Sequence, residues 1–571
     1  MSGTNLNKRR PPFFQKNACS VIAVISLLSL LFFLGYFSAR RKSVTVDEFV
    51  HLPVGYQTLL SHAFRMESRN PPLVRMLAAV PLLHASPRLP EDPRWDHAGA
   101  WYYGYEFMRL NAERYQPLFL AGRTVVLCLS LALGLLVYIF ASHLYGRTVG
   151  LAALFLYCLN PDIIAHSRIT TLDLGLSLFF MAALYFFYRF IRNPGIKNMI
   201  LCGLFLGLAQ TAKFTALFLL LIFPLILLVL YLRQRSKRLS GPLTWKVFAK
   251  LVAVYLMALL VINSVYFWEK TGSPLGAYEF ETPGLRLLNH RVVSWIPVPL
   301  PYHYLKGIDR QRAEKNYTFY LFGKTSKQGW WYYFPVAFLV KTPVPLLLLI
   351  LLAFFRRRQE GQDAWIVLGA VFFFYAIFFM FFSHKYIGLR YLLPLMPIIF
   401  IFAARSVLFI SSRRKILTAL ICLMMLWYTT GSLRIYPHYL SYFNEIAGGP
   451  SEGHRILADS NLDWGQDLIG LKAYMQARGI RTIRLAYFGR VDPAVYGISF
   501  TPLGELPEPG VAAVSVNYLL GLPYFLYYEG ETIPVRPHFF SWLNRFQPVD
   551  RVGYSILVYN IPFETAEGYE E

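Results

Sequence analysis

Long apolar runs dominate this chain of 571 residues from near its N-terminus to about residue 433. Each run holds about twenty mainly apolar residues, the length that an α-helix needs to cross the hydrocarbon core of a bilayer. The pattern predicts a polytopic α-helical membrane protein with about eleven spans, at 18–38, 118–141, 149–166, 174–191, 198–212, 214–232, 248–268, 335–355, 364–383, 391–411 and 415–433.

The pattern changes after residue 434. Turn residues near 448–450, a helical pattern at 467–478 and three alternating runs predict a small soluble α/β domain. We therefore divide the chain into a membrane domain, 1–434, and a C-terminal domain, 435–571. Within the membrane domain, the loops 39–117 and 269–334 are long enough to fold, and aromatic residues in the first of them predict short helices along the membrane interface.

Composition supports a membrane protein. Apolar residues make up 56% of the chain and charged residues 15%, whereas soluble proteins carry roughly 25% charged residues. The net charge of +24 does not indicate nucleic-acid binding, because the basic residues cluster near span ends, beginning with Lys8–Lys16. By the positive-inside rule the N-terminus is cytoplasmic and the C-terminal domain is extracytoplasmic. Arg40–Lys42, on the outer side of the first span, either bind a lipid phosphate or snorkel to the interface.

Asp47 and Glu48 follow the first span by a few residues. Two carboxylates where a helix leaves the bilayer are costly to desolvate and contribute little to anchoring, which favours a chemical role over a packing role. The alternative is that the pair caps a following helix at 49–60, since Asp is a favoured N-cap residue.

Several cations interrupt or separate the later apolar runs. A charge such as Lys213 costs about 2.5–3.5 kcal/mol at the centre of a membrane helix, unless it lies at an interface or meets a partner, and a phosphate is a natural partner. His384, Lys385 and Arg390 form a second group between two spans, where the planar fork of Arg suits phosphate oxygens. Snorkelling is the alternative for Lys213 and Lys385.

The order of these motifs resembles a known family. The acidic pair, the NPPL motif at 70–73, NPDIIAHSRITTLDLGLSLF at 160–179, Lys213 and HKYIGLRYLLPLMP at 384–397 together look like the family 39 glycosyltransferases, over roughly residues 18–433. This family comprises GT-C membrane enzymes that depend on polyprenyl phosphate, including protein O-mannosyltransferases and the aminoarabinose transferase of lipid A. The C-terminal string ADSNLDWGQDLIGLKAYMQARGI resembles a tail of some bacterial members known as phospholipid carrier-dependent glycosyltransferases.

The resemblance implies a role for each motif. Asp47, the first acid of the outer loop, is the catalytic base, and Glu48 assists or orients it. Asp173 is a supporting carboxylate that binds the acceptor or a metal, with helix capping as the alternative. Lys213, His384, Lys385 and Arg390 hold the donor phosphate. Asn70, Pro71 and Pro72 shape a substrate loop, and His166 joins this group, although a lone His at a helix end is more often structural.

These features predict a glycosyltransferase that moves a sugar from a polyprenyl-phosphate donor to a lipid, glycan or protein hydroxyl, with inversion, on the outer face of a bacterial-type inner membrane. The sequence itself requires no cofactor and gives no metal site, although divalent metal use stays open, and nucleic acid is not a partner. Two other classes stay open: a flippase of lipid-linked sugars, for which inverted repeats are missing, and a non-catalytic glycan-binding membrane protein, which leaves the acidic pair unexplained.

Overall fold

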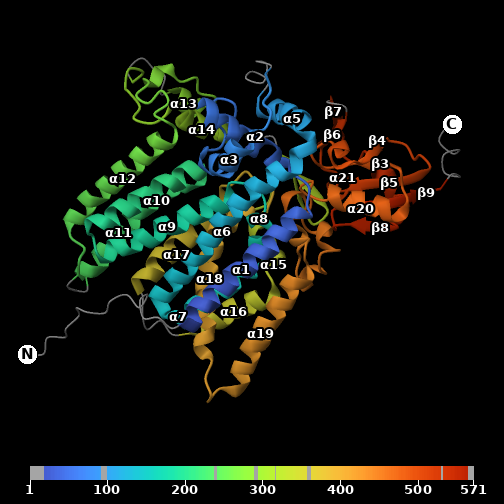
Figure 1. The fold of residues 1–571 in the computed structure, drawn as a ribbon. Coiled ribbons are helices and arrows are strands. Elements are labelled where there is room, and N and C mark those ends of the chain that lie inside the picture. Colours follow the sequence, from blue (N-terminus) through green and yellow to red (C-terminus); the bar gives the residue numbers. More distant parts are fainter. Residues whose placement is uncertain are drawn as a thin grey trace, which may run out of the picture.

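The protein is a bundle of long helices with a small sheet domain at one end (Figure 1). The computed structural model describes residues 18–91, 99–236, 241–287, 293–314, 317–356, 362–528 and 531–562. The basic cluster Lys8–Lys16 therefore lies outside the described residues. The predicted class, a polytopic helical membrane protein with a C-terminal domain that contains a sheet, is confirmed.

Among the described residues, eight helices or joined helices are long and apolar enough to cross a membrane. Two bent pairs raise this number to as many as ten. The bent pairs are α7 with α8 (Arg147–Cys158 and Pro161–Ser167, 63°) and α15 with α16 (Tyr333–Lys341 and Val344–Phe354, 108°). The eight are α1 (Ala18–Arg40), η2–α6 (Ala112–Tyr145), α9 (Asp173–Arg192), η3–α11 (Phe214–Ser236), α12 (Trp245–Val265), α17 (Asp363–Phe381 of Gln362–Phe381), η6–α18–η7 (Leu389–Phe409) and α19 (Lys415–Arg434).

The predicted number of about eleven spans exceeds this range by one helix. The extra helix is α10 (Ile196–Ala212), whose 17 residues are short for a span. It packs between α9 and α12 (Figure 1). A Cβ atom at Gly203 or Gly207 would lie 2.7 or 2.8 Å from a carbonyl oxygen of α12, so this small-residue pair lets the two backbones approach closely.

Short helices from the two long loops lie at the same end of the bundle as the sheet domain (Figure 1). The first loop forms α2 (Val46–Ser61), α3 (Leu73–Ala85) and α5 (Ala100–Leu110). The short helices predicted there are therefore present. The second loop forms η4 (Leu275–Ala277), α13 (Pro283–Arg286), α14 (Tyr302–Ala313) and the hairpin of β1 (Phe319–Leu321) with β2 (Lys324–Ser326).

The C-terminal domain has a mixed five-stranded sheet in the order β4-β3-β5-β9-β8. The parallel pairs are β3–β4 and β3–β5, and the antiparallel pairs are β5–β9 and β8–β9. The predicted helix and strands correspond to α20, β3, β5 and β9. The elements are α20 (Leu468–Arg478), β3 (Thr482–Ala486), β4 (Ser499–Pro502), β5 (Gly510–Ser515), α21 (Val516–Leu519), β8 (Asp550–Val552) and β9 (Ile556–Ile561), with a separate hairpin of β6 (Tyr524–Tyr528) and β7 (Glu531–Val535).

Residues 435–467 join the helical part to the sheet domain and pack against both. Lys341 on α15 donates to the carbonyls of Leu440 and Asn461, at 2.8 and 2.7 Å. The Asn444 amide donates to the Thr342 carbonyl at 2.7 Å. Because this segment contacts the helices so closely, the division of the chain at 434 and 435 stays a prediction.

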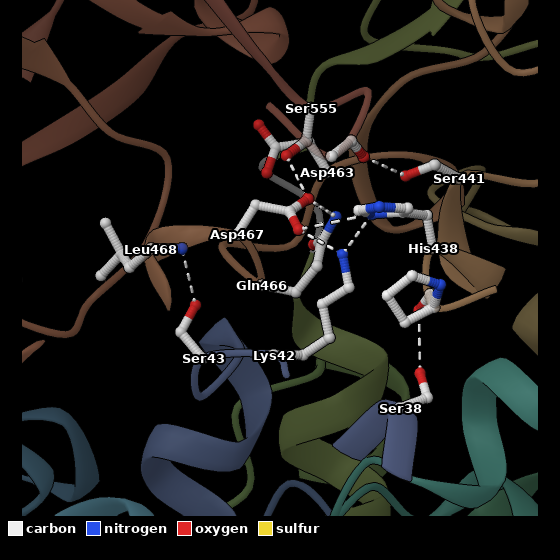
Figure 2. A network of polar contacts seen from close by, with 12 residues as sticks. Ser38, Lys42, Ser43, His438, Ser441, Asp463, Gln466, Asp467, Leu468 and Ser555 are labelled. Carbon is white, nitrogen blue, oxygen red and sulfur yellow. Dashed lines mark hydrogen bonds and ion pairs between the residues drawn. The ribbon is translucent and has the colours of Figure 1, made fainter. Parts of the chain in front are cut away.

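A buried polar network fixes the sheet domain to the end of α1 (Figure 2). Lys42, only 1% exposed, forms an ion pair with Asp467 and a 2.6 Å hydrogen bond with His438 Nδ1. Burial and the neighbouring Lys42 charge lower the pKa of His438 to about 4, so its neutral ring accepts this bond. Both expectations for Lys42 were wrong: it neither meets a lipid phosphate nor snorkels, because Asp467 supplies its counter-charge inside the protein.

Candidate active site

The first turn of α2 opens into a cavity of about 230 Å³. The helix starts after Thr45, and Asp47 is its second residue, with its side chain facing the cavity. In the described part of the chain, four acidic and four basic side chains line this space. They are Asp47, Glu67, Asp173, Glu314, Arg69, Lys213, Lys385 and Arg390.

Arg390 connects the two predicted carboxylates. Arg390 is the second residue of η6 (Leu389–Leu395), and its Nη1 donates to Asp47 Oδ2 at 2.6 Å. The same nitrogen lies 4.0 Å from Asp173 Oδ2. Asp47 and Asp173, separated by 126 positions in the sequence, are thus brought to one guanidinium.

Lys213 completes this group. It follows the last residue of α10 with an extended backbone, and its Nζ donates to Asp173 Oδ1 at 2.6 Å. Its side chain lies over the Tyr391 ring, at 4.4 Å from the centroid. Lys213 is 7% exposed, so the snorkelling alternative is wrong. Asp173 does not cap α9 either, because Leu172 holds the N-cap position.

The Arg390 guanidinium is held between aromatic and carboxylate groups. Its Cζ atom lies 4.2 Å from the centre of the Trp464 ring. Its Nε is buried and has no hydrogen-bond partner among the described residues. A buried donor without a partner is unfavourable by about 1–3 kcal/mol, and a water or ligand oxygen at this position would remove that cost.

Glu48 lies behind the cavity rather than on its lining. Arg123 on α6 binds both of its oxygens, through Nε at 2.8 Å and Nη2 at 2.7 Å. The backbone N–H groups of Thr170 and Thr45 also donate to it, at 2.8 and 3.0 Å. Burial raises the pKa of Glu48, but the Arg123 charge and these hydrogen bonds together hold it below its ordinary value. The carboxylate thereby ties α2 to α6 and to the loop before Asp173. The alternative that the acidic pair caps the following helix is correct for Glu48, which accepts a hydrogen bond from the Thr45 N–H at the start of α2. It is wrong for Asp47.

The structure separates the three members of the second predicted cation group, because Lys385 and Arg390 line the cavity and His384 does not. Lys385 lines the cavity and donates to Glu314 Oε2 at 2.8 Å, so it does not snorkel. His384 is exposed and does not line the cavity, because consecutive side chains of a non-helical loop seldom share one face. Arg69, 3.5 Å from Glu314 Oε1, extends this chain of charges.

Of the predicted substrate loop, only Asn70 lines the cavity. Pro71 and Pro72 are buried, and Pro72 is the residue before α3. Their role in shaping a substrate loop stays a prediction. His166 is buried on α8 with its ring 6.3 Å from that of Trp464. It lines neither this cavity nor the neighbouring one.

Residues 458–468, which we name the clamp segment, hold Asp47 and Arg390 in register. The backbone N–H groups of Val46 and Ser43 donate to the carbonyls of Trp464 and Gln466, at 3.1 and 2.9 Å. The Leu389 N–H donates to Asn461 Oδ1 at 2.9 Å. The clamp segment therefore binds the residue before each member of the Asp47–Arg390 pair.

A second cavity, of about 270 Å³, adjoins the first on the side of the sheet domain. Both cavities are lined by Asp47, Arg390 and Trp101, so these residues stand at their boundary. The clamp segment contributes Asp459 and Trp464, and the sheet domain supplies much of the remaining wall.

Sequence reasoning missed several residues of the site. Arg123 interrupts the apolar run 118–141, and that signal could have found it. His51 follows Asp47 by one helical turn and lines the same cavity, and its Nδ1 has no hydrogen-bond partner among the described residues. Glu67, Arg69 and Glu314 had no signal of this kind, because isolated charges are ordinary in loops.

Comparison with known proteins agrees with the motifs. Residues 116–268 match the sequence model of the family described as dolichyl-phosphate-mannose-protein mannosyltransferase. Two similar solved structures are those of ArnT from Cupriavidus metallidurans. The form bound to undecaprenyl phosphate has 12% identity and a TM-score of 0.48, and the apo form has 11% identity and a TM-score of 0.47. Each alignment covers 95% of this chain and 98% of the other.

No curated protein matches the sequence. The family match spans Arg123, Asp173 and Lys213, which lie in or behind the first cavity. The match covers the part of the chain that carries these three residues, and over that part it agrees with the resemblance to the family 39 membrane glycosyltransferases.

Proposed function

We propose that the protein transfers a sugar from a polyprenyl-phosphate donor to an acceptor hydroxyl, with Asp47 as the general base. The observation that carries this proposal is the 2.6 Å contact of Asp47 with Arg390, in a cavity that also contains Lys213 and Lys385. A base for the acceptor proton and cations for a departing phosphate thus lie in one space, as sugar transfer from a lipid phosphate requires.

The reaction is a single displacement at the anomeric carbon. The acceptor oxygen attacks this carbon while its proton passes to the Asp47 carboxylate. The bond between the anomeric carbon and the phosphate oxygen breaks, and the electron pair leaves with the polyprenyl phosphate. Attack from the side opposite to the leaving group inverts the configuration.

Lys213, Arg390 and Lys385 bind the phosphate and stabilise the charge that grows on it. Asp173 binds Lys213 and lies near Arg390, so it holds the two cations on one side of the cavity. Preorganised charges of this kind are effective because they do not have to reorient during the reaction. Glu48 positions Asp47 through Arg123 and does not itself react.

The proposed location is the outer face of a bacterial-type inner membrane. The basic residues near the predicted cytoplasmic ends of the spans support this orientation by the positive-inside rule. Asp47, α2 and the sheet domain would then face the outside together.

The test is transfer of labelled sugar from a panel of polyprenyl-phosphate sugars by the protein in reconstituted membranes. Asp47→Asn is expected to lose at least about a hundredfold in rate, because the amide cannot take up the acceptor proton, while donor binding is retained. Glu106→Gln, which changes a partly buried acid on α5 that forms an ion pair with Arg109 and lines neither cavity, is the matched control and keeps full activity. Equal transfer by Asp47→Asn and the intact protein would exclude Asp47 as the base.

A further inference from the structure

The second cavity is built from both parts of the protein. Trp101 on α5 and Phe525 on β6 both line it. Arg490, which follows β3, has its guanidinium 5.1 Å from the Trp101 ring centre and 5.6 Å from that of Phe525. The sheet domain therefore closes over the catalytic end of α2 and leaves a space there rather than filling it.

We propose that this second cavity binds the acceptor, and that the acceptor is a carbohydrate. This inference rests on the proposed function and adds to it the class of the acceptor. Because Asp47 borders both cavities, a hydroxyl in the second can reach the base while the phosphate lies beside Lys213 in the first.

The aromatic walls favour a sugar. Trp101 and Phe525 both line the cavity, and their side chains stay 39% and 47% exposed there. The electron-rich face of an aromatic ring attracts the weakly positive C–H groups on the face of a sugar ring. The exposed parts of these two rings therefore offer a pyranose an aromatic surface to pack against.

The charged groups favour a sugar over a lipid chain. Arg490, Asp459 and Arg390 line the same cavity and offer donors and an acceptor to hydroxyl groups. An acyl chain in this position would remove water from these charges without replacing its hydrogen bonds, which is costly. A small number of polar groups on an aromatic wall is the usual construction of a site that orients a polar ligand.

The wall and the base are rigidly connected. Phe49, two residues after Asp47 on α2, stacks on Trp101 with ring centres 6.4 Å apart. The clamp segment fixes the sheet domain to residues 43–46, immediately before Asp47. A sugar stacked on Trp101 is thus held at a defined position relative to the carboxylate, which is the requirement for efficient proton transfer.

The experiment offers the intact protein in membranes a labelled undecaprenyl-phosphate sugar together with three acceptors: an oligosaccharide mixture, Ser/Thr peptides and a lipid with a free hydroxyl. Labelled oligosaccharide is the expected product. Phe525→Ala is expected to raise the KM for the oligosaccharide at least tenfold, without changing the donor KM or the slow hydrolysis of donor by water. Ile533→Ala is the matched control, since Ile533 is equally exposed, at 42%, on the paired strand β7 and does not line the cavity.

The outcomes separate the two proposals. Label found only in peptide or lipid, or an oligosaccharide KM unchanged in both Phe525→Ala and a second variant, Trp101→Leu, overturns the carbohydrate site while donor discharge still supports the glycosyltransferase. Failure of the intact protein to discharge any donor, to acceptor or to water, overturns the proposed function and this inference with it. Unchanged thermal unfolding of both variants checks that neither effect comes from misfolding.

Discussion

Replacing Glu48 with Gln is expected to destabilise the protein strongly, even though Glu48 does not face the cavity. The carboxylate is fully buried and accepts five hydrogen bonds, two from Arg123, two from Thr45 and one from the Thr170 N–H. An amide keeps one accepting oxygen, and its NH₂ group must face N–H donors at the other position. Arg123, 1% exposed, loses its counter-charge.

The magnitude follows from the burial of the pair. Removing one partner of a buried ion pair costs about 3–5 kcal/mol, because the other charge stays buried without compensation. At about 1.4 kcal/mol for each factor of ten, the population of opened molecules rises by about two to three and a half orders of magnitude. Arg123 keeps its bonds to the carbonyls of Ala39, Lys42 and Ser43, which favours the lower part of this range.

Buried thiols provide the assay. Cys158 and Cys202 are fully buried, whereas the other three cysteines, Cys19, Cys128 and Cys422, are exposed and are replaced by Ala in the parent protein. A thiol-reactive dye then reports opening of the bundle, and its labelling rate follows the opened population when reclosing is fast.

Glu48→Gln is expected to raise the labelling rate at least about a hundredfold. The control is Glu106→Gln, which breaks an exposed i,i+3 pair with Arg109, worth only about 0.3–0.5 kcal/mol. A rate for Glu48→Gln within threefold of the parent would refute the view that this carboxylate ties α2, α6 and the loop before Asp173 together.

Three further outcomes are expected. Because the pKa of Glu48 is lowered in the folded protein, its stabilisation is complete above the ordinary value of about 4.3 and is lost as pH falls through the lower folded value. The labelling rate, divided by that of a free thiol at the same pH to remove the loss of reactive thiolate, therefore rises below about pH 4, and less so in Glu48→Gln. Lys213→Met raises the donor KM at least about tenfold in the transfer assay with little change in acceptor KM, because a phosphate contact is lost, whereas Lys197→Met at the opposite end of α10 changes neither. Asn461→Ala lowers kcat with unchanged circular dichroism, because the loop that carries Arg390 loses its anchor, and Asn560→Ala, at an exposed position on β9, does not. Equal kcat values in the two Asn variants would contradict this role of the clamp segment.

Hydrophobic length alone predicted the membrane helices, since each of the eleven apolar runs corresponds to a helix, a helix with adjoining 3₁₀ turns, or a bent pair. The bend of 108° between α15 and α16 could not be predicted in the same way. Pro343 and Pro345 lie in that run and mark a break, but the direction of a bend depends on the neighbours against which both halves pack.

The site was predictable to the extent that its charges stand out in apolar surroundings. Asp47, Asp173, Lys213 and Arg390 could be selected from sequence because a charge near a membrane span needs a reason, and the structure brings all four together. The role of the clamp segment could not be predicted, because its bonds to residues 43–46 and to Leu389 join positions that are more than seventy apart in sequence.

The geometry of Arg390 connects the two sides of the proposed reaction. Its Nη1 is bonded to Asp47, while its Nε has no partner among the described residues. A phosphate oxygen can therefore take the Nε hydrogen without displacing the base, so the same planar group would orient Asp47 and bind the leaving group. A lysine at this position would supply the charge as a single point and would have to give up one contact for the other. The clamp segment meets this need for two fixed donors, because Trp464 packs against the guanidinium and Asn461 holds Leu389, the residue before it.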